Sequence, residues 1–145
     1  PEIYAGSRNY TKSLYVLTAS PSIIKGRVRQ ILSKNKISYK ELILRGNLRE
    51  GKFEYKVRVI SRILNSSDDQ FILIGDDVGK DPEVFAEIQR LFPDRILNSY
   101  VHVVKARAIP QDVTPYWTSF DLALREHLEG RMNEGWVEKI WTKLM

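Results

Sequence analysis

Three carboxylates, those of Asp76, Asp77 and Asp81, lie close together in the sequence, directly after the apolar run 71–74. Hard cations such as Mg²⁺ prefer carboxylate oxygens as ligands. Two adjacent aspartates also repel each other unless a cation or a basic side chain lies nearby. The spacing therefore predicts a magnesium site. An ordinary turn that leads into a helix, with Asp81 as the N-cap and Pro82 at the first helical position, explains the same residues without a ligand.

A second group of candidate residues is suited to binding a phosphate. Thr18 and Ser20 follow the apolar run 14–17 at the start of a predicted helix, where hydroxyl and backbone N–H groups can bind an anion. Ser20 is equally suited to cap that helix without any ligand. Lys56, in the first turn of another predicted helix, and Arg45, at the end of a predicted strand, are cations near the same rim of the expected sheet. A solvated lysine and a surface ion pair are the ordinary explanations for these two side chains.

The elements that must position these residues alternate along the chain between short apolar runs and amphipathic stretches. Near-continuous apolar strands that alternate with helices favour a mostly parallel sheet with helices on both faces. We therefore expect an α/β, Rossmann-like fold in a single domain of residues 1–145, with C-terminal helices in residues 115–145. Ligands of such folds bind at the carboxyl ends of the strands, where the candidate residues lie.

The expected elements follow from the apolar periodicity. The expected strands are 14–18, 41–44, 71–74 and 96–104, and the expected helices are 21–33, 53–64, 81–91, 118–129 and 134–144. In the first of these helices, the face predicted to be buried consists of Ile23, Ile24, Val28, Ile31 and Leu32.

The composition excludes several classes of protein. The 145 residues include no cysteine and two histidines, which excludes a disulfide framework, a cysteine nucleophile, a thiolate zinc site and a histidine-rich metal site. No apolar run approaches the ~18 residues that a transmembrane helix needs, and a cytoplasmic location is expected. The net charge of +5 suits an anionic partner. The basic clusters in residues 25–29 and 34–40 lack interleaved aromatic residues, so we expect no nucleic-acid binding and interpret them as solvated surfaces.

Taken in order, these segments resemble the catalytic domain of the actin-patch-associated type of phosphatidate phosphatase, in the haloacid dehalogenase superfamily. The most specific segment is 71–85, which resembles the family's Phe-Val-Leu-Ile-Gly-Asp-Ser-Gly-Gln-x-Asp-Pro-Glu-Ile-Tyr block. The other resembling segments are Pro1–Tyr4, Tyr15–Pro21, Leu42–Arg45, Tyr55–Lys56 and Ile96–Val101.

The resemblance implies a magnesium-dependent phosphatase that hydrolyses a phosphate monoester, with a phosphatidate-like phospholipid as the expected substrate, through an aspartyl-phosphate. It implies that Thr18 hydrogen-bonds the transferred phosphoryl group and that Lys56 neutralises its charge. Asp76 and Asp81 match aspartates of the family block, and Asp77 stands where the family has serine. All three are taken as candidate metal ligands, and Ser20 and Arg45 as candidate phosphate-binding residues.

The family's nucleophile lies in an Asp-x-Asp-x-Thr motif, and no such motif occurs in these 145 residues. The favoured interpretation is that the chain is the C-terminal portion of a phosphatase domain, inactive alone, whose fold is incomplete at the N-terminus and lacks a strand in or beside the middle of the sheet. One half of a two-chain assembly is an alternative. Another is a catalytically inactive Rossmann-like module that binds phosphate, metal or a partner. Exposed strand edges favour self-association or an N-terminal partner chain.

The last expected helix carries Trp136 and Trp141 on one face. Peripheral membrane contact through this face is one explanation of the tryptophans. Docking of the same face on the rest of the domain is the other.

Overall fold

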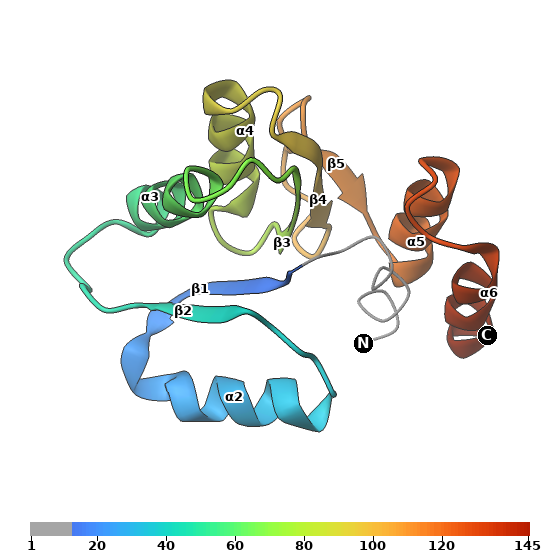
Figure 1. Ribbon diagram of the computed structural model, residues 1–145, viewed down its shortest axis with the longest axis horizontal. Coiled ribbons are helices and arrows are strands. Elements are labelled where there is room, and N and C mark those ends of the chain that lie inside the picture. Colours follow the sequence, from blue (N-terminus) through green and yellow to red (C-terminus); the bar gives the residue numbers. More distant parts are fainter. Residues whose placement is uncertain (1–12) are drawn as a thin grey trace. The chain divides into compact units, whose positions relative to one another are not determined.

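The structure is a computed structural model that describes residues 13–145 (Figure 1). Within these residues, two small parallel sheets are flanked by five helices, which confirms the α/β, Rossmann-like fold class expected from the sequence. The resembling segment Pro1–Tyr4 lies outside the described residues. The chain divides into two compact units. The first unit contains the described residues up to Gly46 together with Thr118–Met145, and the second contains Asn47–Trp117.

The elements agree with the expected ones in type and order, and two short elements are added. In chain order they are β1 (Tyr15–Pro21), the 3-10 turn η1 (Ser22–Ile24), α2 (Lys25–Lys34), β2 (Glu41–Arg45), α3 (Lys52–Leu64), β3 (Phe71–Asp76), α4 (Asp81–Leu91), β4 (Ile96–His102), β5 (Thr114–Tyr116), α5 (Ser119–Leu128) and α6 (Glu134–Leu144).

In the first unit, β1 and β2 form a parallel pair that is connected through η1 and α2. Thr18 lies opposite Leu44 in this pair, and Pro21 lies opposite Arg45, with an irregularity in the register between these positions. Thr18, Ser20 and Arg45 therefore lie toward the carboxyl end of the two strands. Ligands of parallel sheets are expected at that end.

The helix expected from Pro21 begins later in the structure. Pro21 has an extended backbone, with φ −58° and ψ 147°, as the last residue of β1, and α2 begins only at Lys25 after the 3-10 turn. Ile23 and Ile31, which were expected to be buried, are 90% and 56% exposed. The covered stripe is narrower, with one residue every four positions, and consists of Ile24, Val28 and Leu32.

In the second unit, β3, β4 and β5 form a parallel sheet in that order, and α4 connects β3 to β4. The sequence did not predict β5, because it has three residues and one of them is a proline, which is poorly suited to the interior of a sheet. The core of this unit includes buried side chains of α3, α4 and β4, namely Val59, Leu64, Val84, Ile88, Tyr100 and Val101. Each such burial contributes roughly 1.5–3 kcal/mol, so the packing fixes α3 and α4 together with the loop that precedes α4.

The helices α5 and α6 pack against each other around Ala123, Met132, Val137 and Ile140. Each begins at a capped N-terminus. Thr118 and Asp121 form a reciprocal capping box at α5, and the side chain of Asn133 accepts a hydrogen bond from the backbone N–H of Trp136 at α6. These caps satisfy backbone donors that a helix start would otherwise leave unpaired. No helix of residues 13–145 has the length and apolar character required to span a membrane.

Candidate active site

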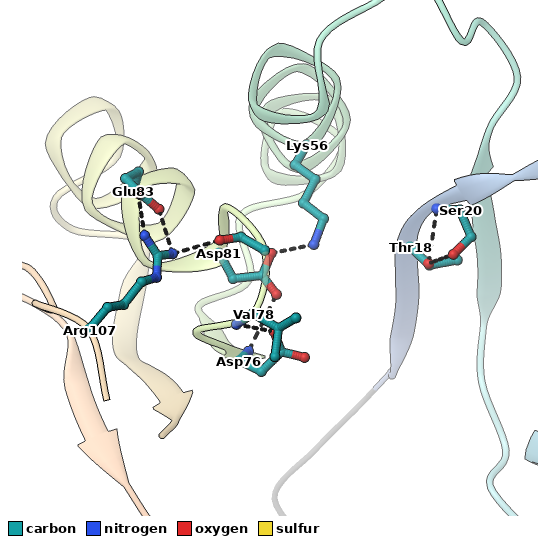
Figure 2. A network of polar contacts seen from close by, with 9 residues as sticks. Thr18, Ser20, Lys56, Asp76, Val78, Asp81, Glu83 and Arg107 are labelled. Atoms are coloured by element: carbon teal, nitrogen blue, oxygen red, sulfur yellow. Dashed lines mark hydrogen bonds and ion pairs between the residues drawn. The ribbon is translucent and has the colours of Figure 1, made fainter. Parts of the chain in front are cut away.

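Asp76 and Asp81 lie at the two ends of the segment that connects β3 to α4 (Figure 2). Asp76 is the last residue of β3 and is exposed. Its carboxylate accepts a hydrogen bond from the backbone N–H of Val78 at 2.9 Å, which turns the chain sharply away from the strand. The backbone N–H of Asp76 in turn points at the Asp81 carboxylate, at 3.4 Å. The connection thus brings two of the predicted carboxylates together at the carboxyl end of a parallel strand.

Lys56 of α3 forms an ion pair with the Asp81 carboxylate (Figure 2). The two side chains are only 15% and 13% exposed, so the pair is partly shielded from water. Because α3 begins at Lys52, Lys56 lies in the second turn of the helix instead of the expected first turn. Lys56, Asp76 and Asp81 are therefore three predicted site residues that the structure brings together.

Asp81 is the first residue of α4 and not its N-cap, which is Lys80. Pro82 accordingly lies at the second helical position. The carboxylate of Asp81 contacts Lys56 and the backbone N–H of Asp76, and this use leaves it in another orientation than a capping side chain needs. The positions expected for Asp81 at the N-cap and for Pro82 at the first helical residue are therefore each wrong by one residue.

Gly75 allows the close approach of Asp81 to the end of β3. A Cβ atom placed on Gly75 would lie 2.8 Å from the Cβ of Asp81 and 2.9 Å from its Cγ. Real Cβ atoms essentially never approach other atoms this closely, so any side chain at this position would displace Asp81. By contrast, a Cβ atom on Gly79, in the same connection, would meet nothing within 4 Å.

Asp77 is completely buried, and both of its carboxylate oxygens are hydrogen-bonded to backbone. The N–H of Val104 donates to Oδ1 at 2.8 Å, and the N–H of Lys105 donates to Oδ1 at 2.8 Å and to Oδ2 at 3.0 Å. Burial raises the pKa of Asp77, but backbone N–H groups of residues 104–107 together outweigh this effect, so the pKa lies below its ordinary value. Asp77 was predicted as a metal ligand, and the structure gives it instead the contacts of a residue that fixes the chain after β4.

Arg107 holds the β3–α4 connection from the opposite side. Its Nε donates to the carbonyl of Asp77 at 2.8 Å, and its Nη2 donates to the carbonyl of Gly79 at 2.6 Å. Both terminal nitrogens also bind the carboxylate of Glu83, at 2.6 Å and 3.0 Å (Figure 2). The Arg107 guanidinium lowers the pKa of Glu83, and Glu83 raises the pKa of Arg107. We call this set of contacts the Arg107 clamp.

The Arg107 clamp was not predicted from the sequence. Arg107 lies in an irregular segment that has no apolar periodicity, and Glu83 reads as an ordinary acidic residue in the first turn of a helix. The one available signal was the repulsion expected between Asp76 and Asp77, which predicted a cation or a basic side chain nearby. Arg107, far along the chain, is a basic side chain that interacts electrostatically with Asp77, although its hydrogen bonds go to carbonyl groups and to Glu83.

In the first unit, Thr18 and Ser20 contact each other at the carboxyl end of β1. The hydroxyl of Thr18 donates to that of Ser20 at 3.0 Å, and the backbone N–H of Ser20 donates to the Thr18 hydroxyl at 3.2 Å (Figure 2). Ser20 caps no helix, because β1 continues through Pro21 and the cap of α2 is Ile24. Arg45 ends β2, opposite Pro21.

The carboxylates of the second unit fit a magnesium ion that is bound by only one or two protein ligands. Among residues 13–145, no group of three or more His, Cys, Asp or Glu side chains is arranged to hold a metal. Magnesium, however, usually keeps several waters and binds one or two carboxylates together with the substrate phosphate. Asp76 is exposed and fits this mode, whereas both oxygens of Asp77 are already engaged by backbone donors.

Together, the fold and the site define an α/β domain in which charged residues lie where a parallel strand ends, the place at which such folds bind their ligands. The family model for "Phosphatidate phosphatase APP1, catalytic domain" matches residues 1–103. The chain therefore belongs to this family, within the haloacid dehalogenase superfamily, as the sequence resemblance predicted. Searches of curated proteins and of solved structures gave no match. The family indicates a phosphatase and a phosphate-ester or lipid substrate.

Proposed function

We propose that this chain carries part of a magnesium-dependent phosphatase site that hydrolyses a phosphate monoester, with a phosphatidate-like lipid as substrate. The proposal rests on one observation above the others. The Lys56–Asp81 pair and the exposed Asp76 carboxylate lie side by side at the carboxyl end of β3, in a chain of a phosphatidate phosphatase family. In the cell we expect the protein in the cytoplasm, peripheral to a membrane that presents such a lipid.

Lys56 is the proposed binder of the phosphoryl group. A positive charge aimed at the place where negative charge develops stabilises the transition state, and it acts most strongly in a shielded environment. Asp81 orients the ammonium group of Lys56, while Gly75 permits Asp81 to lie close enough to do so. Asp81 is thus a positioning residue, and Lys56 is the group that contacts substrate.

Asp76 is the proposed magnesium ligand, with water and a substrate phosphate oxygen completing the coordination. When bound, Mg²⁺ would act as a Lewis acid that neutralises charge on the phosphoryl oxygens. Asp77 is left out of the ligand set, because its oxygens accept hydrogen bonds from the backbone of residues 104–105. Thr18, Ser20 and Arg45 remain proposed phosphate-binding residues.

The nucleophile of the proposed reaction is an aspartate outside these 145 residues, on another segment or another chain. The adjacent pairs Asp68–Asp69 and Asp76–Asp77 do not have the spacing of the family motif. In the part of the chain that the structure describes, β3 forms one edge of its sheet, and the β1–β2 pair stands as a sheet of its own. A further strand can pair with either, which supports a segment or partner chain that completes the fold.

A complete protein that includes these residues is required to test the proposal, with Asp76→Asn as the test variant. Phosphate release from a short-chain phosphatidate and from p-nitrophenyl phosphate is measured over a range of Mg²⁺ concentrations. We expect Asp76→Asn to abolish Mg²⁺-dependent turnover. Asp68→Asn, at an exposed loop position, is the matched control and is expected to keep it. Full activity of Asp76→Asn would refute the proposed metal ligand.

The same assay decides the alternative, an inactive phosphate-binding or partner-binding module, which is favoured by the lack of an Asp-x-Asp-x-Thr motif in these residues. A complete protein that binds Mg²⁺ and phosphate but releases no phosphate from either substrate would establish that alternative. Turnover of p-nitrophenyl phosphate without turnover of phosphatidate would keep the phosphatase and refute the lipid substrate.

A further inference from the structure

The positive charge of the chain is concentrated in one segment. Residues 13–40 contain six lysines and arginines and no aspartate or glutamate, which gives the segment a charge of +6. The whole chain has a net charge of +5, so all the other residues together carry −1. The basic character of this protein is therefore a local property of β1, α2 and the residues that follow α2. The basic residues are Lys25, Arg27, Arg29, Lys34, Lys36 and Lys40.

Exposed isoleucines lie among these cations on the outer side of η1 and α2. Arg27, Ile31 and Lys34 lie on one face of α2, because they follow one another at intervals of four and three residues. Ile23 lies in η1, directly before this helix. All four are exposed, and Ile23 and Ile31 are among the exposed large hydrophobic residues of the chain. The covered stripe of α2 is a different one, centred on Val28 and Leu32. This outer face thus combines apolar tips and positive charges, without an acidic residue.

We infer that this outer face, formed by Ile23, Arg27, Ile31 and Lys34, docks on an anionic lipid bilayer. A helix that lies in a membrane interface combines basic residues, which approach the headgroups, with apolar side chains that enter the acyl boundary. A nucleic acid would pair with the cations but would leave two exposed isoleucines in contact with water, and no aromatic residue of this face can stack on a base. The inference deepens the proposed function, on which it rests for the lipid nature of the substrate.

The expected loss of membrane binding follows from two contributions, that of the basic side chains and that of the isoleucines. Each Lys or Arg near an anionic surface changes the partition coefficient about fivefold, so Arg27→Gln with Lys34→Gln should weaken binding about twenty-fivefold. Each isoleucine that enters the acyl boundary contributes about tenfold, so Ile23→Ser with Ile31→Ser should weaken it by about two orders of magnitude. Because the face is short and only partly apolar, added salt should also release the protein.

The test is cosedimentation of the 145-residue chain with vesicles of phosphatidylcholine alone and with vesicles that also contain phosphatidylserine. Phosphatidylserine is anionic but is not a phosphate monoester, so binding does not require the proposed active site. We expect the chain to bind only the second kind of vesicle and both double variants to lose that binding. Arg58→Gln with Arg90→Gln, which removes the same charge from exposed positions of α3 and α4, is the matched control and should bind as the unmodified chain does.

Three results would overturn the inference. The first is equal binding by the double variants, with circular dichroism showing that they are folded. The second is no binding of the unmodified chain to phosphatidylserine vesicles while it shifts a nucleic acid in a gel. The third is a dimer that Ile23→Ser with Ile31→Ser converts to a monomer, which would assign the face to a second copy of the chain. None of these results depends on phosphatidate being the substrate, so the docking surface and the proposed function can fail separately.

Discussion

The β3–α4 connection and the last residues of β1 both lie at the carboxyl end of a parallel strand, but they are held very differently. In the first, Asp76 bonds the backbone of Val78, Asp81 pairs with Lys56, and the Arg107 clamp fixes the chain from the other side. In the second, Thr18 and Ser20 contact each other through their hydroxyls and through the backbone N–H of Ser20.

The difference follows from the chemical groups at each strand end, which are charged after β3 and neutral at the end of β1. Carboxylates and a lysine in a shielded place repel or misalign unless every charge has a fixed partner, so the β3–α4 connection requires contacts from distant residues. Hydroxyls and backbone N–H groups are neutral and can be arranged by a local turn. The comparison predicts that substitutions in the β3–α4 connection have large effects and that substitutions at the end of β1 have small ones.

After Asp76→Asn, the largest effect should come from Lys56→Met in the complete protein. Removing a charge that stabilises a developing anion costs roughly 10²–10³ in turnover number. Lys52→Met, four residues earlier on the exposed start of α3, is the matched control and should leave turnover unchanged. Phosphate release at saturating substrate is the measurement, and a loss below tenfold would remove Lys56 from the proposed site.

The next largest effect on turnover should come from Gly75→Ala. The new Cβ would lie 2.8 Å from the Cβ of Asp81 and would push Asp81 away from Lys56. Displacement of a positioning contact by about 1 Å can cost roughly 10²-fold in rate. Gly79→Ala, which meets nothing within 4 Å, should be close to neutral. Equal turnover of the two variants would show that the close approach at Gly75 has no part in the site.

Glu83→Gln tests the Arg107 clamp through its dependence on pH. The pKa of Glu83 in the folded chain lies below its ordinary value of 4.5, because Arg107 binds the charged carboxylate. The stabilising contribution is therefore complete above pH 4.5 and is lost as the pH falls through the lower pKa of the folded state. Since the pair is partly exposed, we expect a loss of about 1 kcal/mol in the free energy of unfolding at neutral pH, which shrinks in acid.

Urea unfolding of the 145-residue chain across this pH range measures the effect. Glu87→Gln, which breaks a surface pair with Arg90 three residues away, is the control and should cost less at neutral pH. A loss that does not vary with pH would show that Glu83 acts through packing and not through its charge.

Ser20→Ala should have the smallest effect. It removes the hydroxyl that accepts from Thr18 at 3.0 Å and leaves the hydrogen bond from the Ser20 backbone N–H to the Thr18 hydroxyl intact. A single partly exposed hydrogen bond contributes about 0.5 kcal/mol, so unfolding should shift only slightly and turnover should fall less than about threefold. A loss of turnover as large as that of Gly75→Ala would refute the prediction of small effects at the end of β1 and would place Ser20 in contact with the substrate.

The sequence predicted the order and type of the main elements, because apolar runs and helical periodicity are local patterns. It also predicted which residues gather after β3, since the carboxyl ends of strands are where parallel sheets place such residues. It did not predict the roles within that group. The burial of Asp77 and the contacts of Arg107 depend on how the chain returns after β4, and no local pattern encodes that return. The exposure of Ile23 and Ile31 was missed because the predicted apolar face was wider than the stripe of Ile24, Val28 and Leu32 that the structure covers.

The Arg107 clamp sets a lower limit on how far this chain can be shortened. The family match ends at residue 103, so a version cut there would keep Lys56, Asp76 and Asp81. It would lose the N–H groups of residues 104 and 105, and the buried carboxylate of Asp77 would then have no hydrogen bonds from them. The boundary recognised by sequence comparison and the boundary required for an intact fold therefore differ, and any excised version should extend beyond Arg107 and through β5 to Trp117.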